Sequence, residues 1–355
     1  MRISYLDGLR GFAALIVVVG HIYGTFFGYY STEKLSNPLR LFYDAALSVE
    51  VFFVLSGFVL SYKYLKHRSS SYLRKLVIKR IPRLGIPIFF TLLLIAILYW
   101  CGLFYHVKLG EPFIQRLGVY NPGGLYELIQ CSFLKVFIAS NTNFPLELLW
   151  TMYYEFWGSL LIVLMCFLIY ELRFNILLYI LFLLFSFTYS YHFGCFVFGF
   201  GLAFFYINYH SYFAKKYMIY AVSIALILFI IAYISIPRTH YLISFYACYI
   251  VMSMLFVPQL QTFFSTRALL FLGKISFPLY LVHMIIIASP VSFMALRHKK
   301  HFDEVWFQIS ICLMAIILSV ILAAAFYIFE RLGIKAGAAV ANLLVNEPDS
   351  NINKI

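Results

Sequence analysis

The stretch DGLRGFAALIVVVGHIYG, residues 7–24, is apolar over a length that can cross a lipid bilayer. Three ionisable side chains interrupt it: Asp7 and Arg10 near one end and His21 near the other. Ionisable groups inside a membrane helix are costly, and they usually line a pathway or a site. The stretch therefore predicts a membrane-spanning helix that also carries function.

Helix geometry places the three side chains relative to one another. Arg10 and His21 are eleven residues apart, which is about 20° past three full turns and about 16 Å along the axis. Asp7 stands one turn before Arg10, where an opposite charge is favourable. The pattern suits an elongated ligand with its anionic end at Arg10 and its reactive end at His21. The alternatives are a topology anchor for Arg10, a helix–helix hydrogen bond for His21 and an N-terminal cap for Asp7.

The whole chain has the composition of a membrane protein. Of 355 residues, 63% are hydrophobic and 12% are charged, with a mean hydropathy of +0.90, whereas about a quarter of the residues of soluble domains are charged. We expect an all-α integral membrane protein with about ten transmembrane helices. The apolar runs lie near residues 9–29, 46–62, 84–105, 146–170, 174–190, 193–208, 217–236, 241–257, 271–290 and 305–329.

The positive charges favour one orientation. The net charge is +13, but the Lys and Arg residues mostly lie between apolar runs, so a nucleic-acid partner is not expected. With the N-terminus inside, inner segments hold about twice as many basic residues as outer ones, which predicts that both termini are cytoplasmic. The outer cluster 297–304 runs against this bias, and the long outer segment 106–145 is expected to hold a re-entrant or surface piece.

One membrane domain, residues 1–335, is expected, followed by a cytoplasmic tail, residues 336–355, whose polar end suggests disorder. The six cysteines are scattered without a C-x-x-C pair, and no His or Cys spacing indicates a metal site.

Five segments, in order along the chain, resemble the motifs of the bacterial membrane-bound acyltransferase family 3, which includes O-antigen, Nod-factor and peptidoglycan O-acyltransferases. They are YLDGLRGFAALIVVVGH (5–21), SVEVFFVLSGFVLS (48–61), YLRKLVIKRIPRLGIP (72–87), LWTMYYEFW (149–157) and FLGKISFPLYLVHMIII (271–287). The resemblance implies a stand-alone membrane acyltransferase domain.

The resemblance assigns the chemistry to four residues. His21 would remove the proton from an attacking hydroxyl, or would itself carry the acyl group for a time. Arg10 would orient the donor, and Asp7 would fix Arg10. Glu155 would assist His21 or bind acceptor hydroxyls, the alternative being a salt bridge to an arginine.

The resemblance implies that Arg10, Arg80, Arg83 and Ser56 bind the donor. Arginine forks suit the phosphates of coenzyme A, although Arg80 and Arg83 also fit plain positive-inside anchors and Ser56 fits close helix packing.

The resemblance implies that Glu50, Trp150, Tyr153 and His283 bind the acceptor. Aromatic faces stack on sugars, but Trp150 and Tyr153 also fit an interfacial belt, Glu50 fits a structural role and His283 fits helix packing.

The expected function is O-acetyl transfer from cytoplasmic acetyl-CoA to a hydroxyl of a surface polysaccharide, such as lipopolysaccharide O-antigen, or of its lipid-linked precursor. The enzyme would be a multi-pass protein of the bacterial inner membrane, surrounded by membrane lipid and without a metal. Two alternatives are the same fold with another acyl group or a small-molecule acceptor, and a non-enzymatic polysaccharide transporter.

Overall fold

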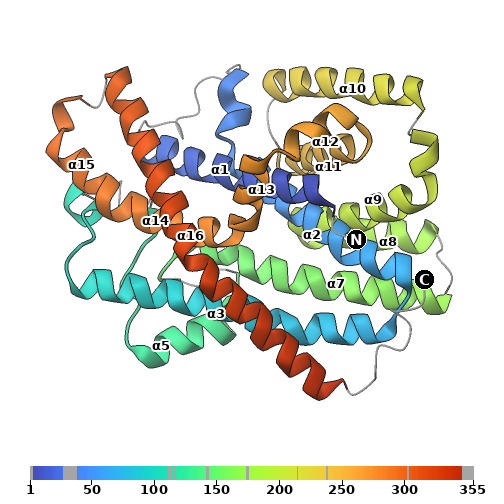
Figure 1. Cartoon of the computed structure of the whole chain (residues 1–355), viewed down its shortest axis with the longest axis horizontal. Helices are drawn as coiled ribbons and strands as arrows, with labels where there is room; N and C mark the ends of the chain where they lie inside the picture. Colours follow the sequence, from blue (N-terminus) through green and yellow to red (C-terminus); the bar gives the residue numbers. More distant parts are fainter. Residues whose placement is uncertain are drawn as a thin grey trace.

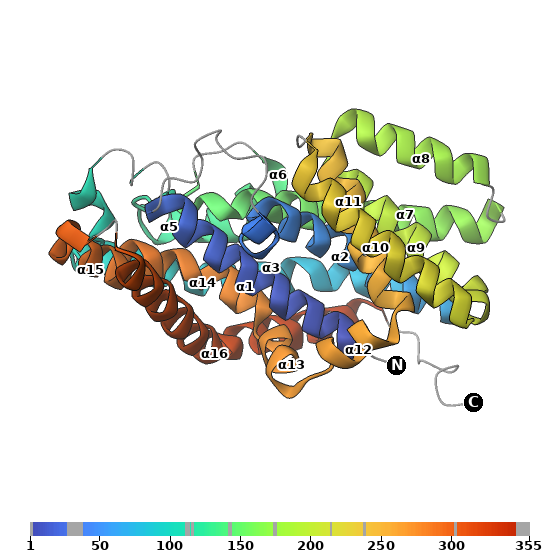
Figure 2. The ribbon, with the colours of Figure 1, turned by 90° about the horizontal axis from the view of Figure 1, so that it is seen from above.

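The computed structural model describes residues 3–345 except 27–37, 111–113, 115–116, 141–143, 173–175, 214, 237–238 and 302–303. Within these residues every regular element is a helix, and the one backbone bridge outside helices joins Val119 to Leu146. Figures 1 and 2 show the helices packed into one bundle, and in Figure 1 the last helix runs from the upper left to the lower edge.

The α-helices are α1 Ser4–Phe26, α2 Ala45–His67, α3 Ser70–Trp100, α5 Leu125–Gln130, α6 Val136–Ile138, α7 Trp150–Leu172, α8 Ile176–Tyr189, α9 Tyr191–Phe213, α10 Lys216–Ser235, α11 His240–Phe256, α12 Pro258–Phe264, α13 Arg267–Lys274, α14 Ser276–Ile286, α15 Ser292–Arg297 and α16 Val305–Leu344. The short 3₁₀ and π segments are η1 Pro38–Phe42, η2 His106–Leu109, η3 Cys131–Lys135, η4 Glu147–Leu149, η5 Ile287–Val291 and η6 Lys299–His301.

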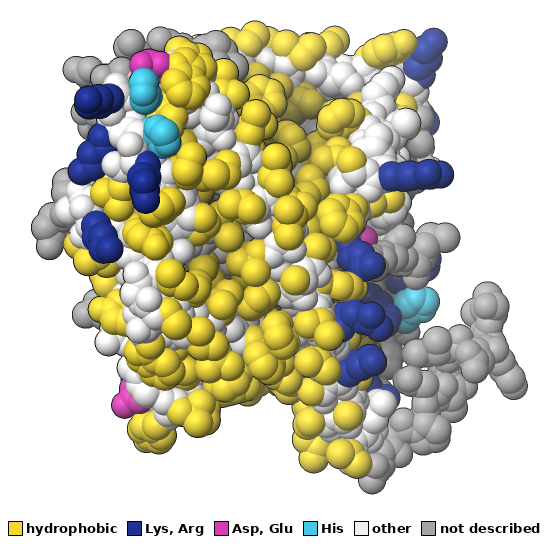
Figure 3. All heavy atoms as spheres, turned by 60° about the vertical axis from the view of Figure 1, so that its left-hand side comes forward, with side chains coloured by type: hydrophobic (Ala, Val, Ile, Leu, Met, Phe, Trp, Pro, Cys, Tyr) yellow, Lys and Arg dark blue, Asp and Glu magenta, His cyan; other side chains and the backbone are white. Residues whose placement is uncertain are grey.

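Among the described residues, eight helical stretches are long and apolar enough to cross a membrane. The pair α11 and α12, bent by 95°, makes a ninth if it is one span. The expectation of about ten is met only if the 14-residue apolar helix α8 also crosses the membrane. Figure 3 shows the corresponding broad hydrophobic surface, with Lys and Arg gathered along its two sides. The prediction of an all-helical, multi-pass membrane protein is confirmed.

Glycines allow the central helices to approach closely. A Cβ atom on Gly57 of α2 would lie 2.2 Å from the carbonyl oxygen of Phe196 in α9, and one on Gly199 would lie 2.2 Å from that of Val54. Small residues at membrane helix crossings permit such backbone contact. This crossing fixes α2, which carries Glu50 and Ser56, against α9.

A second glycine contact joins α1 to α13. A Cβ atom on Gly11 would lie 2.3 Å from the backbone nitrogen of Gly273, and one on Gly273 would lie 2.1 Å from the carbonyl oxygen of Asp7. The backbones therefore touch beside Asp7 and Arg10, and Lys274 is brought to the same place.

The last helix is longer than the sequence suggested. α16 runs to Leu344 and packs against α3, with Gly333 and Gly337 against the backbone of α3. Residues 336–344 of the expected tail continue this helix. Residues 346–355 lie outside the described residues.

The segment 106–145 contains short helices. η3 packs against α3, where the ring of Phe133 lies against Gly85, and α6 packs against α7. Because Gly85 lies in the middle of α3, η3 lies beside the middle of α3 rather than at its end.

Candidate functional site

A cavity of about 580 Å³ opens among α1, α2, α3, α7, α13, α14 and α16. The structure brings six predicted residues together on its wall: Asp7, Arg10, Ser56, Arg80, Arg83 and Glu155. These residues lie on four helices and are up to 148 positions apart in the chain. Motifs that are far apart in the sequence therefore contribute to one site in the folded protein.

The cavity wall is strongly cationic. Among its described lining residues the basic side chains are Arg10, Lys63, Lys79, Arg80, Arg83 and Lys274, and the acidic ones are Asp7, Glu155 and Glu330. Twice as many positive as negative groups face one space, so a ligand with several negative charges suits it. The sequence analysis assigned no role in the site to Lys79 or Lys274, although both lie inside the motifs quoted above.

Arg80 and Glu155 form the ion pair that joins α3 to α7. An Nη1 atom of Arg80 lies 3.1 Å from Oε1 of Glu155, and the Oγ of Ser56 donates to the same oxygen at 3.1 Å. Arg80 is buried and the Glu155 side chain keeps 18% exposure. The salt-bridge alternative for Glu155 is thus present, and the pair still faces the cavity.

His21 and His283 lie outside the described lining of this cavity but next to one of its walls. Tyr280 lines the cavity, and its ring centre is 6.1 Å from that of His283. The rings of His21 and His283 meet edge to face, with centres 5.1 Å apart. The hydroxyl of Tyr280 donates to the Leu148 carbonyl at 3.1 Å, which holds the Tyr280 ring on the cavity wall beside His283.

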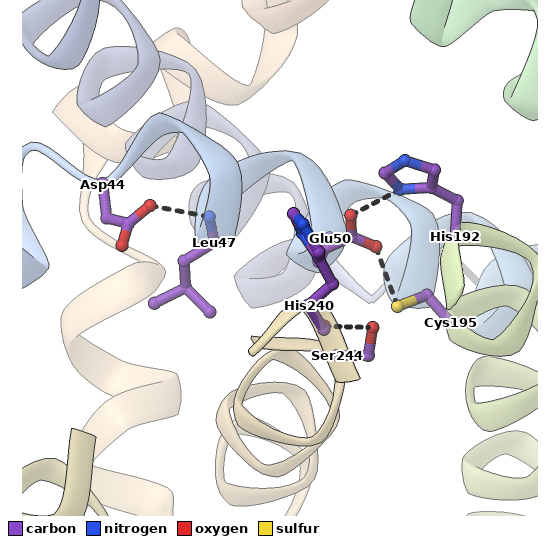
Figure 4. Close-up of polar contacts among 7 residues, drawn as sticks. All are labelled: Asp44, Leu47, Glu50, His192, Cys195, His240 and Ser244. Atoms are coloured by element: carbon purple, nitrogen blue, oxygen red, sulfur yellow. Dashed lines mark hydrogen bonds and ion pairs between the residues drawn. The ribbon is translucent and has the colours of Figure 1, made fainter. Parts of the chain in front are cut away.

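Glu50 lies in a separate polar cluster, shown in Figure 4. Its carboxylate oxygens lie 2.6 Å from Nδ1 of His192 and 3.0 Å from the Sγ of Cys195, both on α9. Glu50 is 2% exposed and is not among the described cavity residues. The observed contacts therefore favour the structural alternative for Glu50. Sequence reasoning missed His192 and Cys195, because nothing in the spacing links them to Glu50.

Trp150 and Tyr153 also lie outside the described cavity wall. The Trp150 ring packs 5.1 Å from the ring of His192, and the Tyr153 hydroxyl lies 3.4 Å from that of Tyr189. Trp150 therefore packs against the Glu50 cluster through His192, and Tyr153 lies against Tyr189. Within the described residues no group of three His, Cys, Asp or Glu side chains is arranged to hold a metal ion.

Taken together, the structure is that of a multi-pass helical membrane protein with a cationic cavity between its helices. The family described as acyltransferase domain matches residues 3–324. The chain belongs to this family of membrane acyltransferases.

One similar protein is the O-acetyltransferase PaAT-1 of Phomopsis amygdali, which is 37% identical over 99 residues. That match covers 24% of this chain and only 20% of the relative, so the chain corresponds to about a fifth of it. No solved structure matches the chain.

Proposed function

We propose that the protein transfers an acyl group, most simply acetyl, from a coenzyme A thioester to a hydroxyl group. The observation that carries this proposal is the cationic cavity beside the histidine pair. Coenzyme A carries a pyrophosphate and a 3′-phosphate, and arginine forks and lysines are the side chains that bind such groups. Arg80 and Arg83 would hold the phosphates on the cavity wall, together with Lys79 and Lys274.

The donor would then extend along α1 from Arg10 toward His21, about 16 Å further along the axis. A neutral imidazole there can accept the proton of the attacking hydroxyl or carry the acyl group itself. Because Tyr280 lines the cavity and packs beside His283, the thioester would pass beside its ring. Glu155 would hold Arg80 in position through the observed ion pair.

The acceptor that we propose is a hydroxyl of a cell-surface polysaccharide or its lipid-linked precursor, with lipopolysaccharide O-antigen as one example. A cytoplasmic donor and an outer acceptor would meet at His21, so coenzyme A would not need to cross the membrane. This arrangement suits a bacterial inner-membrane enzyme with both termini in the cytoplasm, which the two-to-one bias of Lys and Arg supports.

The test is thioester turnover by the purified full chain in lipid nanodiscs. Acetyl-CoA with a soluble or lipid-linked glycan should give equal amounts of free coenzyme A thiol and acetyl ester. Arg83→Ala is expected to raise the KM for acetyl-CoA about tenfold or more, because a charge-assisted contact contributes about 1.5–3 kcal/mol. Arg297→Ala, at an exposed site outside the described cavity wall, is the matched control. Turnover that is unchanged in Arg83→Ala would contradict this binding site.

A further inference from the structure

Two imidazoles meet between α1 and α14, which contact one another in the bundle. The ring centres of His21 and His283 are 5.1 Å apart, and the ring planes are inclined at 74°. Within the described part of the chain, neither ring forms an ion pair with a carboxylate. Two neighbouring bases without a counter-ion are a costly arrangement in a membrane interior.

Backbone carbonyls fix the same tautomer in both rings. Nδ1 of His21 lies 3.0 Å from the carbonyl oxygen of Val17, and Nδ1 of His283 lies 3.1 Å from that of Leu279. A carbonyl oxygen only accepts hydrogen bonds, so each Nδ1 must be the donor. In a neutral ring the lone pair then lies on Nε2. Each histidine therefore presents a basic Nε2.

The two Nε2 atoms differ in their surroundings. His283 is fully buried, and its Nε2 has no hydrogen-bond partner among the described residues. His21 keeps part of its surface exposed. Buried polar atoms without a partner are rare in folded proteins because they cost free energy. The unpaired Nε2 of His283 is thus a site for a hydrogen-bond donor from a ligand, such as a hydroxyl group.

We propose that the two histidines divide the work of acyl transfer: His21 carries the acyl group, and His283 is the general base for the acceptor hydroxyl. This inference rests on the proposed function. Once an acyl group is attached to Nε2 of His21, that nitrogen has no lone pair left and cannot deprotonate the acceptor. A second base is then needed beside it, and His283 is the neighbouring imidazole.

The bonds balance in two steps. In the first step Nε2 of His21 attacks the thioester carbon, the carbon–sulfur bond breaks, and coenzyme A leaves as a thiolate that takes a proton from water. In the second step the acceptor oxygen attacks the acyl carbon while its proton passes to Nε2 of His283. The carbon–nitrogen bond breaks, His21 returns to the neutral form, and His283 loses its proton to water.

The experiment separates the two steps in the full chain in nanodiscs. Exchange of radiolabelled coenzyme A into acetyl-CoA, without any acceptor, reports the first step only, since it requires a reversible acyl-enzyme. Transfer to glycan reports both steps. His283→Gln and His283→Asn are compared with wild type, with His21→Ala, and with His298→Gln as an exposed histidine control. The two His283 variants differ in which ring nitrogen they imitate, and neither supplies a base.

We expect both His283 variants to keep the exchange rate within about threefold of wild type and to lose glycan transfer by about 100-fold or more, which is the usual contribution of a general base. Hydroxylamine, which attacks acyl groups without a general base, should be acylated at near wild-type rates. His21→Ala should lose exchange and both transfers, and His298→Gln should lose neither.

Three results would overturn the inference while the proposed function stands: wild-type transfer without exchange, His283 variants that transfer to glycan at near wild-type rates, or folded His283 variants that lose exchange. Wild type that neither exchanges coenzyme A nor transfers acetyl would overturn the proposed acetyl-CoA function and this inference together.

Discussion

Replacing Glu155 by Gln tests the contribution of the Arg80–Glu155 ion pair on the cavity wall to stability. The variant keeps the size of the side chain and an oxygen that accepts from Ser56, but it removes the charge that faces Arg80. Two unit charges about 4 Å apart attract by about 4 kcal/mol at an effective dielectric constant of about 20. Since Glu155 is 18% exposed and faces the cavity, we expect the unfolding free energy to fall by about 2–4 kcal/mol.

The assay is reversible SDS-driven unfolding in mixed micelles, followed by far-UV circular dichroism, for Glu155→Gln, Arg80→Gln and the double variant. The double variant should lose about 2 kcal/mol less than the sum of the single losses, because the two single variants remove the same interaction. Glu304→Gln removes the exposed pair with His301 and should leave the unfolding transition nearly unchanged, because exposed ion pairs contribute little to stability. Additivity of the Arg80 and Glu155 losses within about 0.5 kcal/mol would show that the two side chains do not stabilise each other.

Two further predictions concern packing and acid stability. Gly57→Ala should prevent α2 from approaching α9, since the new Cβ would lie 2.2 Å from the carbonyl oxygen of Phe196. The yield of folded protein in detergent should therefore fall sharply. The control Gly124→Ala, where the nearest atom is a flexible carboxylate oxygen at 3.1 Å, should express normally. Normal yield of Gly57→Ala would show that this contact is not tight. Burial lowers the pKa of His106, which lies outside the spanning helices, so the unfolded chain binds a proton at a higher pH than the folded chain. The unfolding free energy should therefore fall as the pH drops below about 6.5, and a pH series on His106→Gln should show a shallower decline; equal slopes would contradict the burial argument.

Much of the fold was predictable from the sequence. Long apolar runs have few alternatives to membrane helices, because the backbone must satisfy its own hydrogen bonds in lipid. The ends of the helices were harder to predict from the sequence. The extension of α16 to Leu344 depends on Gly333 and Gly337 packing on α3, which is a tertiary contact that the hydropathy of the segment does not reveal.

The motifs predicted part of the candidate site. Six of the predicted residues meet in one cavity, because the ordered motifs lie on helices that pack together. Glu50 behaves differently, since its partners His192 and Cys195 lie more than 140 positions away. The closeness of His21 and His283 could not be read from spacing either, because it depends on how α1 and α14 cross.

Acyl transfer that depends on Arg10 and His21 is tested through the hydroxylamine-labile acetyl content of the surface polysaccharide. It would be measured in cells that lack the gene and are complemented with wild type, Arg10→Ala, His21→Ala or the exposed control His298→Gln, each inserted at the same level. We expect wild type and His298→Gln to restore acetylation and the Arg10 and His21 variants not to restore it. Equal restoration by all four proteins would contradict the catalytic roles of Arg10 and His21, which would then be structural residues.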